Sequence, residues 1–375
     1  MKNLILVSDF DFSRDGFPAS GYSKIAVTLG NALTDKGWKV HGFGVTYNRK
    51  EINTKFGINS IRPNDIPQMI STLHRGVGIE KVLYVFDIPF IEMILNNFQN
   101  FEKLAIKQYG IFAVEADPLC MSWALSMSRL NGWGVISEFG KNEANKAGLP
   151  AEHYPVPINL NIWKERTLEE KLMVKEALGL KDKYVIFING DGNERKNHSA
   201  MLEGLAIAKK TNPNIHAIML TRKNSPFSWK LDDLMVQLDI IDNLTIVDRG
   251  IPEEDVWKLY VGSDAFYNLS KAEGLCLPIL EAMAVGVPVV ATNATAMKES
   301  LQDKRGILLD ADYIWIDPFG NTNRYFVYPE KIAKTMIKMS QKDDNYTKMT
   351  KAARKYVESR TVENAVEVAE RILNA

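Results

Sequence analysis

Two glutamates stand eight positions apart in a stretch that is otherwise mostly apolar, "SKAEGLCLPILEAMAVGVPVV", residues 270–290. Glu281 falls early in a predicted helix, where a carboxylate stabilises the positive end of the helix dipole, so it has a structural explanation. Glu273 has none, because it lies in a predicted loop between a strand and that helix. A loop carboxylate beside Gly274 and a helix N-terminus is suited to binding a polar ligand. We expect the Glu273 side chain to lie near solvent and to be unnecessary for folding.

A second group that could do chemistry is the pair of basic residues in "NGDGNERKNH", residues 189–198. Arg195 and Lys196 follow Gly190 at the junction between a predicted strand and a predicted helix. Cations oppose the positive N-terminal end of a helix, so a purely structural role is unfavourable for them. They are suited to neutralising a phosphate, with a solvated helix start as the structural alternative. His198, in the same segment, is expected on the surface.

Two weaker candidate sites lie in the first half of the chain. Gly21, in "GFPASGYSK", follows the first predicted strand, where a missing side chain would let a ligand approach the backbone; an ordinary turn is the alternative. Glu115 and Asp117, in "FAVEADP", end another predicted strand and could face a ligand cleft. For Asp117 the preferred explanation is a turn-forming role before Pro118.

Two Asp-x-Asp patterns raise the question of a metal ion. Asp9 and Asp11 follow the first predicted strand, and Asp310 and Asp312 follow the last one without nearby companion ligands. Carboxylates of this kind can bind magnesium, but aspartates at strand ends commonly form turns. The basic pair and a helix dipole can already neutralise a bound phosphate. We therefore expect that no metal and no other cofactor is required.

The elements that must position these residues are short apolar runs that alternate with segments of helical periodicity. Such alternation predicts an α/β fold, with parallel sheets covered by helices on both faces. Ligands of these sheets bind at the carboxyl ends of the strands, which is where the candidate residues lie. The predicted strands of the first half are "LILVSDF", "VLYVFDI", "AIKQYGIFAVE" and "GWGVIS", and those of the second half are "YVIFING", "IHAIMLTR", "LTIVDRG", "AFYNLS", "VPVVATN" and "GILLD".

The length of 375 residues predicts more than one hydrophobic core. We predict one Rossmann-like domain over residues 1–158 and a second over residues 159–355. The join lies near "VPINLNIW", residues 156–163. A final helix over residues 356–375 is expected to cross back toward the first domain.

Composition excludes several classes of protein. The 46 Lys and Arg residues balance the 46 Asp and Glu residues, so nucleic-acid binding is not indicated. Cys120 and Cys276 form neither a metal-binding spacing nor a disulfide framework, which favours a cytoplasmic location. The first apolar run is too short for a signal peptide, and no stretch approaches the roughly 20 apolar residues of a membrane span. These patterns leave peripheral membrane association open.

One further segment, "DYIWIDPFGNTNRYFVY", is rich in aromatic residues and predicts a β-hairpin. Pro318, Gly320 and Asn321 are turn-forming residues near its middle. We expect its aromatic residues to pack against the body of the protein, and an assembly surface is the alternative.

The segment "GIPEEDVWKLYVGSDAFYNLSKAEGLCLPILEAMAVGVPVVATN", residues 250–293, resembles the nucleotide-binding domain of family 4 glycosyltransferases. The signature of that family is a glutamate, seven residues and a second glutamate, here Glu273 and Glu281. "SGYSKIAVTLGNALTDKGWKV", "GVISEFGKNEANKAGL" and "ERKN" are similar to other parts of the family, and the resemblance is strongest after residue 180. It implies the GT-B fold, in which an acceptor-binding and a nucleotide-sugar-binding Rossmann-like domain face each other across a cleft.

The resemblance also implies roles for individual residues. Glu273 would contact the donor sugar, Glu281 would bind the ribose hydroxyls, and Arg195 and Lys196 would stabilise the leaving diphosphate. Gly21 would approach the diphosphate or the acceptor. The remaining donor-binding residues would be Gly190 beside the basic pair, Arg249, Gly250 and Ile251 near the base, and Gly274, Leu275, Cys276 and Leu277 through their backbone amides.

The sequence departs from the family pattern in several places. Asp191 occupies a position where many members have an arginine, for which Arg195 is the candidate replacement. Glu115 and Asp117 lie where many members have a histidine that contacts the sugar. Cys276 replaces the usual glycine, so the approach of the backbone to the ligand would differ, and "INLN" replaces a frequent Asn-Gly-Val-Asp.

The implied activity is that of a retaining, hexosyltransferase-like enzyme that moves a sugar from a nucleoside diphosphate to an unknown acceptor. Attack would occur on the front face, with a donor phosphate oxygen helping to deprotonate the acceptor, so no dedicated base is required. One alternative is another GT-B sugar-nucleotide enzyme, such as an epimerase. The other is a relative that binds the nucleotide sugar without turnover.

Overall fold

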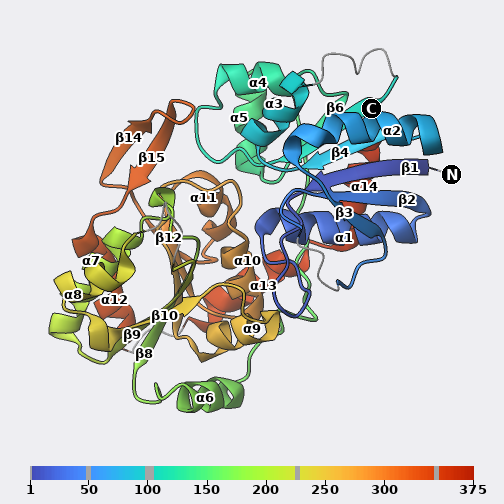
Figure 1. The fold of residues 1–375 in the computed structure, drawn as a ribbon. Helices are drawn as coiled ribbons and strands as arrows, with labels where there is room; N and C mark the ends of the chain where they lie inside the picture. Colours follow the sequence, from blue (N-terminus) through green and yellow to red (C-terminus); the bar gives the residue numbers. More distant parts are fainter. Residues whose placement is uncertain (1, 48–51, 98–104, 224–228, 342–345) are drawn as a thin grey trace. The chain divides into compact units, whose positions relative to one another are not determined.

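The computed structural model describes residues 2–47, 52–97, 105–223, 229–341 and 346–375. The chain forms two compact units, one of residues Met1–Pro157 with Arg360–Ala375 and one of residues Ile158–Ser359. Unit 1 therefore ends one residue before the predicted boundary at 158, and its C-terminal segment begins at residue 360 rather than 356. Each unit is built around a parallel sheet with helices on both faces, so the predicted α/β class is confirmed (Figure 1).

Both sheets have the strand order of a Rossmann fold. In unit 1 the order is β3-β2-β1-β4-β5-β6-β7, and in unit 2 it is β10-β9-β8-β11-β12-β13. In each sheet the first strand of the unit lies beside the fourth, and the chain reverses its winding direction there. The carboxyl ends of β1 and β4 in unit 1, and of β8 and β11 in unit 2, are therefore the places where such sheets bind ligands.

The strands of unit 1 are β1 (Lys2–Ser8), β2 (Trp38–Gly44), β3 (Gly57–Ser60), β4 (Lys81–Val85), β5 (Lys107–Phe112), β6 (Gly132–Val135) and β7 (Glu152–His153). Its helices are α1 (Gly21–Asp35), the 3-10 turn η1 (Pro63–Asp65), α2 (Ile66–Val77), α3 (Ile88–Asn97), α4 (Met121–Met127), α5 (Glu138–Lys146) and α14 (Val362–Leu373). The four predicted strands are present. The prediction missed β2, which contains two glycines, and β3 and β7, which are short and largely exposed.

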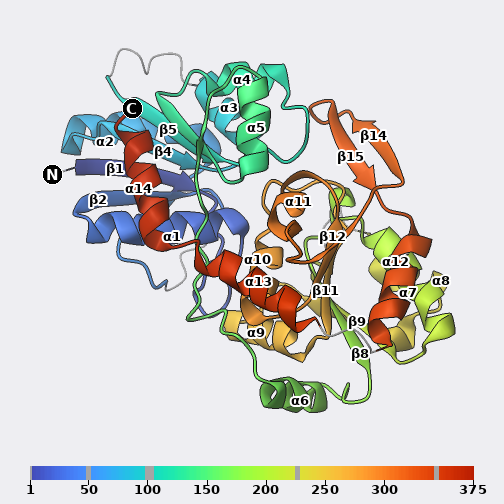
Figure 2. The same cartoon turned by 180° about the vertical axis from the view of Figure 1, so that it is seen from behind.

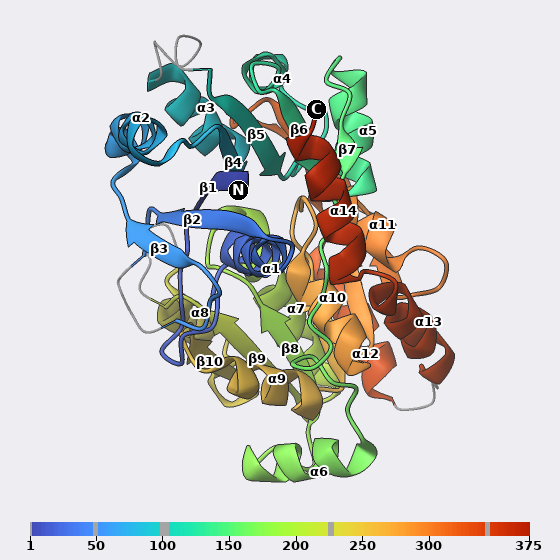
Figure 3. The same ribbon diagram turned by 90° about the vertical axis from the view of Figure 1, so that its right-hand side faces the viewer.

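The C-terminal helix α14 packs beside α1 and against β6 of unit 1 (Figures 2 and 3). Gly134 of β6 makes room for it, because a Cβ atom at that position would lie only 2.6 Å from Ile372 Cδ1. Glu370 on α14 accepts hydrogen bonds from Lys36 Nζ (3.0 Å) and Trp38 Nε1 (3.2 Å). Residues from the far end of the chain thus complete the cover of one face of this sheet.

The strands of unit 2 are β8 (Tyr184–Asn189), β9 (Ile215–Thr221), β10 (Leu244–Asp248), β11 (Ala265–Asn268), β12 (Val289–Thr292) and β13 (Ile307–Leu309), which are the six predicted from the sequence. The helices are α6 (Leu168–Ala177), α7 (His198–Thr211), α8 (Leu231–Gln237), α9 (Glu253–Gly262), α10 (Leu277–Val285), α11 (Thr295–Leu301), α12 (Pro329–Ser340) and α13 (Thr347–Glu358), with 3-10 turns η3 (Glu194–Lys196) and η4 (Ile241–Asn243).

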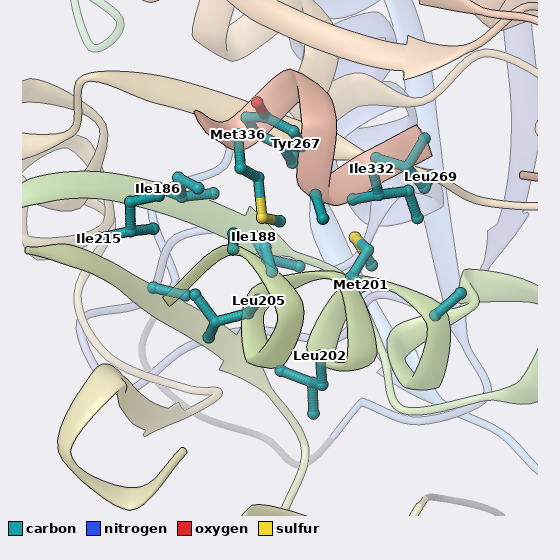
Figure 4. Packing of buried hydrophobic residues seen from close by; sticks show 14 of the residues in the cluster. Ile186, Ile188, Met201, Leu202, Leu205, Ile215, Tyr267, Leu269, Ile332 and Met336 are labelled. Carbon is teal, nitrogen blue, oxygen red and sulfur yellow. The ribbon is translucent and has the colours of Figure 1, made fainter. Parts of the chain in front are cut away.

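One hydrophobic core of unit 2 lies between its sheet and the helices α7 and α12. Met201 and Leu205 of α7, together with Ile332 and Met336 of α12, are buried against apolar side chains of the strands (Figure 4). This core holds β8 firmly against its neighbours. The loop that carries Arg195 and Lys196 therefore begins from a rigid strand end.

The aromatic-rich segment forms the predicted hairpin, with β14 (Tyr313–Asp317) paired antiparallel to β15 (Thr322–Phe326). Gly320 and Asn321 in the turn have φ values of 77° and 52°, the left-handed conformation that glycine and asparagine adopt most readily. The expectation that this segment packs against the body is wrong for β14, whose large apolar side chains are exposed. Among the described residues, no helix is long and apolar enough to cross a bilayer.

Candidate active site

Glu273 lies at the carboxyl end of β11, buried between two cations. Its carboxylate oxygens lie 2.6 Å from Lys196 Nζ and 2.8 Å from Arg195 Nη1. The expectation of a side chain near solvent is wrong, because the loop after β11 is covered by the turn η3. Arg195 Nη1 donates to Ala272 O (2.6 Å), and Lys271 N donates to Arg195 O (2.8 Å). The structure therefore brings together the three residues that were predicted to be catalytic.

The charge state of Glu273 follows from this environment. Burial alone would raise the pKa of the carboxyl, but the charges of Arg195 and Lys196 outweigh it and lower the pKa to about 2. Glu273 is thus ionised at neutral pH, and the cluster of one anion and two cations carries a net positive charge. An anionic ligand would be attracted to such a cluster.

The turn η3 reaches β11 because the residue that directly follows the turn adopts an unusual backbone conformation. Asn197 has φ 56° and ψ 37°, in the left-handed region, and its side-chain amide donates to Leu269 O (3.2 Å). This contact ties the start of α7 to the end of β11. The cations and the carboxylate thus occupy the ends of β8 and β11, where the sheet of unit 2 changes its winding direction.

Glu281 is buried on α10 and is held by a tyrosine. The Tyr260 hydroxyl of α9 lies 3.0 Å from Glu281 Oε2, and Asn189 Nδ2 donates to the same hydroxyl (3.2 Å). Burial and the charge of Glu281 raise the pKa of Tyr260, so its hydroxyl stays protonated. Sequence reasoning missed Tyr260, since an aromatic residue in a helix is most simply explained as part of the core.

Cys276, directly before α10, has φ 67° and ψ 73°. This is the left-handed conformation that glycine adopts without strain, which accounts for a glycine being the usual residue here. Asn268 Nδ2 lies 3.0 Å from Cys276 Sγ, and burial raises the pKa of the thiol, so it is unsuited to act as a nucleophile. The backbone amides of the first turn of α10 follow it, and such amides lack partners within their own helix.

Asp191 forms a second charged cluster at the ends of β8, β9 and β10. Its Oδ1 atom accepts hydrogen bonds from Arg249 Nη1 (2.7 Å) and Arg222 Nε (3.2 Å). Burial tends to raise the pKa of Asp191, but the two arginines lower it overall. The position expected to carry an arginine thus carries a carboxylate that gathers two arginines from neighbouring strands. Sequence reasoning missed Arg222, which no motif singles out.

His198 is buried at the start of α7, so the expectation that it lies on the surface is wrong. A Cβ atom on Gly190 would lie 3.8 Å from its Nε2 atom, which places the ring beneath the loop that joins β8 to η3. Burial and the nearby charge of Lys196 lower the pKa of His198 to about 4. The imidazole is therefore neutral at physiological pH and adds no charge to the cluster.

In unit 1, the predicted residues lie at the carboxyl ends of β1 and β5. Gly21 is the first residue of α1, which Ser20 caps by accepting a hydrogen bond from Ser23 N (2.9 Å). The charge of Glu115 contributes to raising the pKa of the buried Tyr22, after the larger effect of burial. Asp117 lies beyond β5 in the same unit.

The two Asp-x-Asp patterns are held by ordinary hydrogen bonds. Asp9 accepts from Ser23 Oγ (2.7 Å), and burial raises its pKa. Asp310 accepts from Asn293 Nδ2 (2.6 Å), and Asp312 lies 2.6 Å from Lys331 Nζ. Within the described ranges, no group of three or more His, Cys, Asp or Glu side chains is arranged to hold a metal ion.

Comparison with known proteins places the chain in a family. Residues 169–356 match the family model described as glycosyl transferases group 1. The chain belongs to the group 1 glycosyltransferases. The matched region includes Arg195, Lys196, Glu273 and Glu281, and therefore the whole charged cluster of unit 2.

Curated relatives match shorter stretches. The O-antigen chain mannosyltransferase B of Escherichia coli is 31% identical over 138 residues, which are 34% of this chain and 32% of the relative. The lipopolysaccharide core biosynthesis mannosyltransferase LpsB of Rhizobium meliloti is 30% identical over 153 residues, which are 38% of this chain and 42% of the relative. The match thus spans less than half of the length of either relative.

Solved structures match the fold over the full chain. The structure of Anabaena Alr3699/HepE in complex with UDP and glucose has a TM-score of 0.73 at 13% identity and covers 100% of both chains. WaaG, a glycosyltransferase involved in lipopolysaccharide biosynthesis, has a TM-score of 0.66 at 11% identity and covers 99% of this chain and 100% of its own. The predicted GT-B fold of this group 1 glycosyltransferase is therefore confirmed.

Proposed function

We propose that this group 1 glycosyltransferase is a family 4 enzyme that transfers a hexosyl group from a nucleoside diphosphate sugar with retention of anomeric configuration. The observation that carries the proposal is the cluster of Glu273, Arg195 and Lys196. It lies at the ends of β8 and β11, where sheets of this strand order bind nucleotides.

The two cations and the helix start suit a leaving diphosphate. As the bond between the sugar and the phosphate breaks, negative charge develops on the diphosphate oxygens. Arg195 and Lys196 can donate charge-assisted hydrogen bonds to those oxygens, and the positive end of the helix dipole of α10, which begins at Leu277, would add to their effect. Because Glu273 holds both cations in place, little reorganisation is needed when the donor binds.

The carboxylates would address the hydroxyl groups of the donor. Glu273, ionised and fixed, can accept hydrogen bonds from hydroxyls of the transferred sugar. Glu281, held by Tyr260, can accept hydrogen bonds from the ribose hydroxyls. Arg249, Gly250 and Ile251 follow β10 and would lie near the base, as the resemblance implies.

The proposed chemistry takes place on one face of the sugar. The bond from the anomeric carbon to the diphosphate oxygen breaks while the acceptor oxygen forms a bond on the same face. A donor phosphate oxygen accepts the acceptor proton, so no protein base is needed. The HepE structure that contains UDP and glucose, and the relatives named mannosyltransferases, support a nucleoside diphosphate hexose as the donor class.

The test begins with thermal unfolding in the presence of a panel of nucleotide sugars. A donor present at about 100 times its Kd, and bound only by the folded state, should stabilise the protein by about 2.7 kcal/mol. The donor that stabilises most is then incubated with candidate acceptors, and the anomeric configuration of the product is determined by NMR. An inverted product would contradict the proposal, and binding without transfer or hydrolysis would favour the binding-only alternative.

We further expect that activity does not depend on a divalent metal. Arg195, Lys196 and the start of α10 supply the positive charge that a metal would otherwise supply. Activity with the correct donor should therefore survive exhaustive chelation by EDTA. Activity that vanishes and returns with magnesium or manganese would contradict this expectation and direct attention to Asp9 and Asp11, for which Asp11→Asn is the matching variant.

A further inference from the structure

The hairpin of β14 and β15 is fixed at its inner strand. Tyr325 N donates to Lys271 O (2.9 Å), and the Lys271 ammonium lies 4.3 Å from the centre of the Phe326 ring. The buried Arg324 donates from Nε to Asp317 Oδ2 (3.0 Å), which links the two strands. These contacts join β15 to the loop after β11, so β14 is the outer strand of a hairpin with a defined position (Figure 1).

The outer strand exposes a continuous run of large apolar side chains. The exposed fractions are 46% for Tyr313, 54% for Ile314, 44% for Trp315 and 62% for Ile316. Alternate side chains of a strand point to opposite faces, so the exposure of four consecutive residues means that both faces of β14 are uncovered. Single exposed apolar residues are common on proteins, whereas a contiguous set of this kind indicates an interaction surface.

β14 is also an open strand edge without the usual protection. Within the described part of the chain, only β15 pairs with it. Natural edge strands avoid association by being short or by carrying lysine or proline. Of the other edge strands, β3, β7 and β13 have only four, two and three residues, and β10 has five, but its apolar side chains are buried or partly buried. β14 has five residues and neither lysine nor proline, and the charge of its last residue, Asp317, is paired with Arg324.

We infer that β14 is a self-association edge, which pairs antiparallel with β14 of a second copy of this chain to form a continuous four-stranded sheet. The strand is complementary to itself. A two-fold axis perpendicular to the sheet at Trp315 would place Ile314 of each copy opposite Ile316 of the other, with no like charges opposed. Such a contact closes after two copies, and it covers the open edge of β14 in each copy.

The size of the contact determines how the dimer should behave. Two five-residue strands bury less surface than the roughly 1,200 Å² at which specific, stable interfaces begin. The association is therefore expected to be reversible and to depend on protein concentration. It involves no residue of the charged cluster, so it does not rest on the proposed function.

Sedimentation velocity over a concentration series tests the inference. The unmodified chain should shift from monomer to dimer as concentration rises, and Ile314→Lys/Ile316→Lys should remain a monomer. The matched control is Leu168→Lys/Leu172→Lys, which adds the same charge to exposed apolar positions of α6, where the exposed fractions are 72% and 49%. That control should still dimerise. Unchanged circular dichroism and thermal unfolding show that each variant is folded.

A cysteine variant gives a second readout that does not depend on adding charge. In a Cys120→Ser background, Trp315→Cys should form a covalent dimer under mild oxidation, whereas Leu172→Cys should not. A chain that sediments as a monomer at every soluble concentration overturns the inference. So does a dimer that the hairpin lysines leave intact and that Trp315→Cys fails to cross-link.

Discussion

Replacing Glu273 with glutamine should lower turnover with the correct donor by about 100-fold or more, the scale of losing one preorganised electrostatic group. The amide keeps the shape of the side chain but removes the charge that holds Arg195 and Lys196. These cations would then be buried without their counter-ion. Breaking a buried ion pair by removing one partner commonly destabilises a protein by about 3 kcal/mol or more, so thermal unfolding should also occur at a lower temperature.

The pH dependence of stability separates the electrostatic role of Glu273 from damage to the fold. The folded pKa of about 2 lies below the ordinary value of 4.5, so the ionised carboxylate stabilises the fold fully above pH 4.5. This contribution is lost as the pH falls from 4.5 toward 2. The free energy of unfolding of Glu273→Gln should therefore fall less between pH 4.5 and pH 2 than that of the unmodified chain. Urea unfolding at several pH values measures this difference.

The matched control is Glu176→Gln, which makes the same chemical change in an exposed ion pair with Lys181 (3.1 Å). It should leave turnover and stability nearly unchanged, because exposed pairs contribute little. Near-normal turnover of Glu273→Gln at a temperature where it is fully folded would refute the catalytic assignment.

Replacing Arg195 and Lys196 together with alanine should weaken binding of the nucleoside diphosphate by roughly 100-fold to 1,000-fold, because two charge-assisted hydrogen bonds are lost. Binding of the bare nucleoside should change little. Titration calorimetry with both ligands measures the difference, and Lys181→Ala serves as the surface control. Equal losses for nucleoside and nucleoside diphosphate would show general damage instead of a lost phosphate contact.

A triple variant is needed to separate the loss of the two cations from the effect of an unpaired Glu273. Removing both cations leaves the Glu273 carboxylate buried without its partners, which by itself repels an anionic ligand. The triple variant that also carries Glu273→Gln removes this repulsion. It should recover part of the stability but not the binding of the diphosphate, because the donors remain absent. Recovery of full diphosphate affinity in the triple variant would mean that the cations act only through Glu273.

The fold could be predicted from sequence largely because buried parallel strands are continuous apolar runs. The runs "YVIFING" and "IHAIMLTR" are typical of buried strands, and the corresponding β8 and β9 are buried throughout. β2 was missed because its two glycines and its lysine interrupt such a pattern. The first unit ends at Pro157, within the segment 156–163, which shows neither the helical nor the strand periodicity of apolar residues.

The site was predicted less completely, because its contacts join residues far apart in sequence. Glu273 was expected near solvent since loops usually are, and its burial results from a turn 77 residues earlier in the chain. The same long-range packing buries His198. Tyr260 and Arg222 were not predicted at all, because a tyrosine in a helix and an arginine after a strand have many ordinary explanations.

The packing of α14 on unit 1 has a consequence for biosynthesis. Residues Ile158–Ser359 leave the ribosome before Val362–Leu373, so unit 2 has its complete sequence available while unit 1 still lacks the helix that covers α1 and β6. The unit that is translated first is therefore completed last. Until α14 is synthesised, the apolar surface that it covers would lack its partner, so we expect a chain that ends near residue 360 to have a destabilised N-terminal unit although every residue of its sheet is present.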